Sequence, residues 1–190
     1  MKKLIAMLLV LMIGVSLVAC GNDTLSNNGF VGKPSTDETP DNTETVLTLT
    51  GTMEESINAI NENHAEMELP LMVMPLDLTD VEGFTYYTGL TSTDNIVDAA
   101  FCEPMMGQPY SLVLVRVAEG ADAEAVAKEM YEKVDMRKWV CMEADTKTAA
   151  AYGDVAMFFM VNSEFAEQVT TTTMMDAFKA VCGEGVTVIG

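Results

Sequence analysis

The hydrophobic and polar positions in the second half of the chain follow two periods. Apolar residues run continuously or alternate in four segments, as is typical of strands, and helical spacing follows each pair. The strand segments are Ile96–Glu103, Tyr110–Ala118, Thr146–Tyr152 and Val155–Val161, and the helices are Ala121–Val134 and a segment that starts at Asn162. The β-β-α-β-β-α order predicts an α+β fold with an antiparallel sheet of about four strands and helices on one face.

The segments that precede this sheet are shorter. Thr52, with Glu55 three residues later, forms a capping box and begins a predicted N-terminal helix over residues 53–64. Residues 69–76 are predicted to be extended, because their two prolines exclude a helix. Residues 83–90 are aromatic and bounded by glycines, which predicts a short strand or turn that covers an apolar surface.

Neither face of the predicted sheet is polar. Val155–Val161 is apolar at every position, and Tyr110–Ala118 carries valines on one face and leucines, with Arg116, on the other. A strand with one face in water would alternate with polar residues. We therefore expect the second face to be covered, either by the first helix and residues 67–90 or by a partner protein.

The last helix changes its apolar face part of the way along. Phe165 and Val169 lie on one side at helical spacing, whereas the later apolar residues lie about half a turn away, at Met174, Phe178 and Val181. The threonines at 170–173 between these groups are β-branched and form a poor helical run. The pattern predicts a break or kink at these threonines.

The N-terminus has the three parts of an export signal. Lys2 and Lys3 precede an apolar run from residue 4 to residue 18, which is too short to span a bilayer as a stable helix. The run ends in Leu17-Val18-Ala19-Cys20, which resembles the lipobox of bacterial lipoproteins. The resemblance implies a signal peptide over residues 1–19 that is removed, and a lipid attached to Cys20. The alternative is an ordinary signal peptide that happens to contain a cysteine.

A polar segment separates this signal from the folded part. Residues 20–50 are rich in Asn, Asp, Thr, Ser, Gly and Pro, and cannot bury enough apolar surface to offset the entropy of ordering. A flexible linker of roughly 28 residues has an end-to-end distance of about 30 Å. We expect a disordered tether followed by a single α+β domain over residues 51–190.

The charge balance limits the partners of the chain. The 190 residues include 29 acidic and 10 basic residues, and the net charge of −19 becomes −21 once the two signal lysines are removed. Without a basic patch, nucleic acid is not an expected partner. A cationic partner is compatible with this charge, as is a simple role of acidity in keeping an exported domain soluble.

Residues that bind metals or cofactors are few, and we expect neither a metal nor a cofactor. The single histidine, His64, lies on the apolar face of the first helix. Cys102, Cys141 and Cys182 are an odd set with no Cys-x-x-Cys spacing, so they are either buried small hydrophobes or include one disulfide. The 16 methionines show no sustained ligand repeat, which favours core filling over a copper(I) site.

The sequence contains no catalytic motif. Acidic pairs such as Asp77 and Asp80 are compatible with carboxylate catalysis, but a chain this acidic forms such pairs by chance. Arg116 is unusual inside an apolar strand. It could anchor an anionic ligand, it could pair with a neighbouring acid, or it could lie at a sheet edge and oppose strand pairing there. A second candidate is an aromatic binding surface at Phe84, Tyr86 and Tyr87, although these side chains could equally fill the core.

Residues 96–165 contain an apolar strand before a charged helix, a Val134-Asp135 helix end and a hairpin that ends in Phe159-Met160-Val161. Together they resemble a family of small bacterial lipoproteins defined by a domain of unknown function. The resemblance supports the anchor and the single domain, and implies no activity. We expect a lipid-anchored protein on the extracytoplasmic face of the cell membrane that binds an envelope protein without catalysis. An enzyme that uses carboxylates on envelope polymers, or a small-molecule or metal carrier, is the alternative.

Overall fold

Antiparallel strands in the order β1-β2-β3-β5-β4-β6 form one sheet at the centre of the domain. The computed structural model describes residues 49–64, 70–164 and 168–190, which belong to one unit of residues 43–190. In chain order, the elements are α1 (Met53–Glu62), β1 (Leu71–Pro75), α2 (Val81–Thr88), β2 (Ile96–Pro104), β3 (Tyr110–Val117), α3 (Ala123–Lys133), β4 (Thr146–Tyr152), β5 (Val155–Val161), α4 (Thr171–Cys182) and β6 (Thr187–Ile189). The predicted signal, Cys20, the linker up to residue 48 and Phe165 lie outside the described residues.

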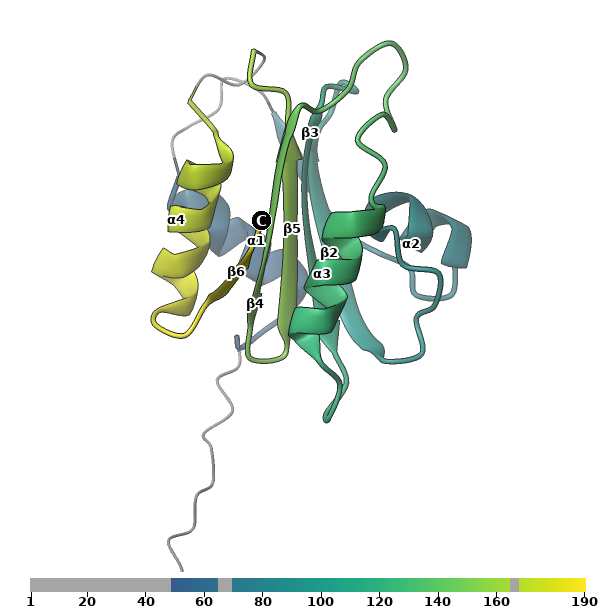
Figure 1. The fold of residues 1–190 in the computed structure, drawn as a ribbon, viewed down its shortest axis with the longest axis vertical. Helices are drawn as coiled ribbons and strands as arrows, with labels where there is room; N and C mark the ends of the chain where they lie inside the picture. The colour runs from purple at the N-terminus through teal and green to yellow at the C-terminus, as the bar shows by residue number, and fades with distance from the viewer. Residues whose placement is uncertain (1–48, 65–69, 165–167) are drawn as a thin grey trace, which may run out of the picture. The chain divides into compact units, whose positions relative to one another are not determined.

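Helices cover both faces of the sheet (Figure 1). One core lies between the sheet and α1 with α4, and a second core lies between the sheet and α2 with α3. The central strands β3 and β5 supply both cores, because their alternate side chains point to opposite faces. Leu112, Leu114, Met157 and Phe159 enter the first core, and Val113, Val115, Phe158 and Met160 enter the second. Full burial of each large side chain contributes about 1.5–3 kcal/mol.

Polar side chains fix where the helices begin. Thr52 Oγ1 accepts a hydrogen bond from Glu55 N at 3.2 Å, and Glu55 Oε2 accepts one from Thr52 N at 2.9 Å. This confirms the predicted capping box of α1. Asp122 Oδ1 caps α3 in a similar way, by accepting from Ala125 N at 3.0 Å. These bonds satisfy backbone donors that a helix start leaves free.

The predicted order of elements is confirmed, but the predicted size of the sheet is wrong. Two successive strand–strand–helix units, β2-β3-α3 and β4-β5-α4, appear as expected. Two further strands, β1 and β6, extend the sheet at its edges, so the described sheet has six strands and not about four. The prediction that the helices lie on one face is also wrong, because α4 packs in the first core and α3 in the second. The expectation that the second face is covered is confirmed, and helices of the chain itself cover it.

The aromatic segment after Asp80 is a helix, so the predicted strand or turn at 83–90 is wrong. Asp80 Oδ1 accepts from Gly83 N at 3.0 Å, which starts α2, and Gly89 ends it in the left-handed conformation with φ of 70°. The close approach of Gly89 to the backbone of Lys133 and Val134 leaves no room for a Cβ. The capping aspartate, four residues before the first aromatic residue, is the signal that the prediction did not use.

The last helix starts within the threonine run. Thr170 caps α4 together with Thr173, and residues 162–164 before it are not helical. The threonines therefore start the helix, where the sequence predicted a break or kink in a longer one. In the part of the chain that is described, no helix is long and apolar enough to cross a membrane.

Candidate interaction surface

A buried lysine lies where β2, β3 and the loop after α3 meet. Lys138 Nζ pairs with Glu103 Oε1 at 2.6 Å and donates a hydrogen bond to Ser111 Oγ at 3.0 Å. The side chain of Lys138 is only 2% exposed. Burial lowers the pKa of Lys138, whereas the charge and the hydrogen bond of Glu103 act in the opposite direction. The ion pair therefore offsets part of the cost of taking the ammonium group out of water.

Three aromatic rings surround the same ammonium group. Lys138 Nζ lies 5.1 Å from the ring centre of Tyr86, 4.6 Å from that of Tyr87 and 5.2 Å from that of Trp139. At such distances a cation is attracted to the ring faces. Tyr86 Oη also donates a hydrogen bond to the backbone oxygen of Lys138 at 3.1 Å. We use the name Lys138 cluster for the side chains of Tyr86, Tyr87, Glu103, Ser111, Lys138 and Trp139. The cluster joins α2, β2 and β3 to the loop.

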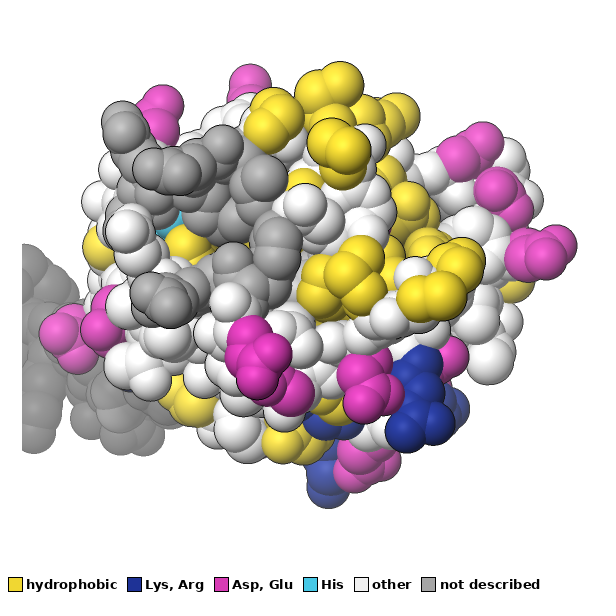
Figure 2. Space-filling model, turned by 90° about the horizontal axis from the view of Figure 1, so that it is seen from above, with side chains coloured by type: hydrophobic (Ala, Val, Ile, Leu, Met, Phe, Trp, Pro, Cys, Tyr) yellow, Lys and Arg dark blue, Asp and Glu magenta, His cyan; other side chains and the backbone are white. Residues whose placement is uncertain are grey.

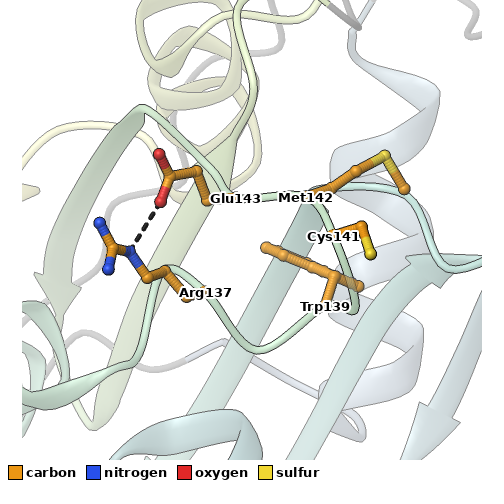
Figure 3. A pocket seen from close by; sticks show the side chains of 5 residues that line it. All are labelled: Arg137, Trp139, Cys141, Met142 and Glu143. Atoms are coloured by element: carbon orange, nitrogen blue, oxygen red, sulfur yellow. Dashed lines mark hydrogen bonds and ion pairs between the residues drawn. The ribbon is translucent and has the colours of Figure 1, made fainter.

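The loop from residue 134 to residue 145 carries the outer part of the site. Residues Trp139 and Met142 form an isolated bridge, and Cys141 between them has a φ of 65°. Arg137 Nε and Glu143 Oε2 pair at 2.7 Å on the other side of the loop. Figure 3 shows these five side chains around an open hollow of about 360 Å³, with the ion pair at one wall and the indole, thiol and thioether at the other.

Exposed apolar side chains surround the Lys138 cluster. Met106 in the β2–β3 turn is 72% exposed, Val140 in the loop is 88% exposed, and Tyr86 on α2 is 46% exposed. We use the name Lys138 surface for the exposed side chains of Met72, Met74, Tyr86, Met105, Met106, Val140 and Met142. Figure 2, which views this end of the molecule, shows several groups of hydrophobic side chains with acidic side chains near them.

Several contacts connect the elements that carry these side chains. Met72 on β1 lies opposite Glu103 in the sheet register, and Glu103 holds Lys138. Gly107, beside Met106, lies against the ring of Trp139. These contacts place β1, α2, the β2–β3 turn and the loop around the Lys138 cluster, and the exposed side chains of the Lys138 surface lie on these neighbouring elements.

The predicted aromatic residues occupy different places. Phe84 is buried in the core between the sheet and α3, and does not reach the surface. Tyr87 stacks on Phe101, with ring centres 3.9 Å apart, and is half-buried. Burial raises the pKa of Tyr87 to about 12, so its hydroxyl stays protonated at neutral pH. Tyr86 alone of the three is exposed on the Lys138 surface.

Arg116 lies away from this surface, at the opposite end of β3. Its guanidinium donates to the backbone oxygen of Gly51 at 2.6 Å and to that of Leu49. It also pairs with Asp154 at 3.2 Å and with Asp98 at 3.9 Å. These contacts tie the start of the described domain to the sheet, which explains why a charged residue occurs in an otherwise apolar strand.

The buried polar residues and thiols have little access to a substrate. Ser111 and Lys138 have the residue types of a nucleophile and its base, but Ser111 is fully buried. The three described cysteines outside the signal are free; Cys102 and Cys182 are buried, and Cys141 is exposed. Burial raises the pKa of Cys102 to about 11 and that of Cys182 to about 12, so both remain thiols near pH 7. Among the described residues, no three His, Cys, Asp or Glu side chains are placed to hold a metal ion.

The sequence did not point to Lys138, Glu103 or Trp139. A lysine that follows Arg137 in the loop after a helix has the pattern of a solvated residue, and its ion pair joins positions that are far apart in the chain. The single tryptophan of the chain, next to Lys138, was the one available signal. Comparisons with protein families, with curated proteins and with solved structures find no match to this chain.

Proposed function

We propose that the chain is a lipoprotein anchored to the extracytoplasmic face of the cell membrane, and that its domain binds another envelope protein without catalysing a reaction. The signal and the Leu17-Val18-Ala19-Cys20 motif support the anchor. The Lys138 surface is the observation that supports binding.

Two properties of the Lys138 surface favour a protein partner. Its large apolar side chains stay exposed on a chain of net charge −19, where solubility alone would favour charged groups. Most of them are methionines, whose flexible thioethers adapt to apolar partners. The Lys138 cluster beneath holds the supporting elements together, which lowers the entropy lost on binding.

The position of this surface fits a tethered domain. The described domain begins at Leu49, which Arg116 holds at one end of β3, whereas the β2–β3 turn lies at the other end (Figure 1). The chain therefore enters the described domain at the end of β3 that is opposite to the Lys138 surface.

A small-molecule carrier is the second candidate, and the hollow beside Trp139 is the observation that favours it. An enzyme that uses carboxylates has less support at this site. Among the described residues, Glu143 is the single acid that lines the hollow, and it is already paired with Arg137.

Photo-crosslinking in intact cells tests the binding surface. A benzophenone amino acid at Met106 of the full chain should give a light-dependent product of higher mass that contains a second protein. Val97 is the matched control. It is 56% exposed and lies near the start of β2, whereas Met106 follows the end of that strand. Absence of a product from position 106, or equal products from both positions, would contradict the proposal.

Metabolic labelling tests the anchor. Cells that produce the full chain are given an alkyne fatty acid, and the label on the chain is compared with that on the Cys20→Ala variant. The proposal predicts label on the unchanged chain and none on the variant, because the thiol of Cys20 is the first site of acylation. Equal label on the two chains would show that the lipid, if present, is attached elsewhere.

A further inference from the structure

β1 is an edge of the described sheet, and its backbone groups alternate between two directions. Leu76 N donates to Ala99 O at 2.8 Å, and Met105 N donates to Pro70 O at 3.1 Å. Antiparallel ladders are made by every second residue. Met72 and Met74 therefore also bond to β2, and the N–H and C=O groups of Leu71 and Val73 point outward.

Pro75 agrees with this alternation. Pro75 is an outward residue by the same count, and proline is tolerated at an edge where its missing N–H would face solvent. Pro104, the register partner of Leu71, faces β3 by the same count and makes no backbone bond to β1. The outward edge of β1 thus offers two N–H donors, at Leu71 and Val73, and three carbonyl acceptors.

The side chains next to this edge are apolar and partly open. Met72 is 38% exposed and Met74 is 42% exposed, and both belong to the Lys138 surface. Leu71 and Val73 pack against the core on the opposite face. An added strand would therefore place alternate side chains against the two methionines, and the same strand would meet the outward N–H groups.

Acidic residues follow β1 directly. Asp77, Asp80 and Glu82 are exposed, and β1 itself carries no charge. In an antiparallel pairing, the N-terminal end of the incoming strand lies beside the C-terminal end of β1. Basic residues at that end of a partner would be attracted to the three carboxylates.

We propose that β1 binds an extended apolar segment of another protein as an additional antiparallel strand, with basic residues on the N-terminal side of that segment. This inference rests on the proposed role of the domain in binding a protein, and it names the kind of segment that is bound. A second copy of the chain fits less well, because each copy has a net charge of −19 and supplies no basic residue from its own β1.

A defined peptide tests the pairing. The probe is acetyl-Lys-Lys-Val-Thr-Val-Thr-Val-amide, added to the full chain in lipid nanodiscs, with empty nanodiscs as the blank. Binding should slow hydrogen exchange of two amides in the fragment of residues 70–76, those of Leu71 and Val73, by at least about tenfold. The same peptide with N-methyl groups on the amides that face β1 should not bind, because strand addition requires those donors.

Variants of the chain separate strand addition from other modes of binding. Val73→Pro removes an outward donor without removing a bond to β2, and should raise the Kd of the probe at least tenfold. If thermal unfolding shows that this variant is not folded, Met74→Arg serves instead, since it changes only an exposed side chain and repels the lysines. Glu82→Gln should raise the Kd about two- to threefold at low salt. Glu124→Gln, which alters the matching first-turn acid of α3, should leave the Kd unchanged.

The outcomes distinguish this inference from the proposed function. If the probe does not bind, or binds Val73→Pro and Met74→Arg as tightly as the unchanged chain, strand addition at β1 is wrong. Crosslinks from position 106 in cells would then still support a protein-binding surface. If sedimentation shows a dimer that Val73→Pro dissociates, the occupant of the edge is a second copy, and the inferred foreign segment is wrong.

Discussion

Lys138 shows how a single charged residue can shape an apolar surface. Its ammonium group is buried between Glu103, Ser111 and three aromatic rings, while its backbone carries the exposed loop. A buried ion pair adds little net stability relative to apolar residues, but a buried charge that loses its partner costs several kcal/mol. The pair therefore makes the position of the loop depend on one specific contact.

Replacement of Lys138 tests this dependence. Lys138→Met leaves the Glu103 carboxylate buried without its partner and should lower the free energy of unfolding by about 3–5 kcal/mol. The double variant Lys138→Met with Glu103→Met should recover most of that loss. Lys133→Met, which breaks the exposed pair with Glu129, should cost at most about 0.5 kcal/mol. Urea unfolding measures all three, and a neutral effect of Lys138→Met would contradict the account.

At the scale of elements, strong local patterns predicted the structure well. Continuous apolar runs identified β3 and β5, and the box of Thr52 and Glu55 placed the start of α1. The elements that were missed have weak or mixed patterns. β6 has only three residues, and the aromatic residues of α2 favour strands unless the capping Asp80 is weighed.

Little of the candidate site could be predicted from the sequence. Tyr86 and Tyr87 were selected for their aromatic character, and both contact Lys138 in the structure. The role of Lys138 depends on an ion pair with Glu103 across the fold, which no local pattern encodes. The exposure of Met105 and Met106 also depends on tertiary packing, because methionines are more often buried.

At the scale of the whole molecule, the two ends of the sheet have different roles. One end carries Arg116 and receives the chain at Leu49, and the other carries the β2–β3 turn and the loop with Trp139. The sequence predicted that either the chain or a partner protein covers the second face of the sheet. In the structure, helices of the chain cover both faces. Binding is therefore expected at the exposed end and at the β1 edge.

Methionine oxidation in intact cells tests the central claim most directly, that the Lys138 surface is covered by a partner protein. A short pulse of peroxide is applied to cells and to the purified full chain in nanodiscs, and Met105 and Met106 are followed by mass spectrometry. Val188→Met supplies a control methionine on β6, at the other edge of the sheet. The account predicts that Met105 and Met106 oxidise at least about threefold more slowly in cells, relative to the control position. Equal relative rates in cells and in nanodiscs would contradict it.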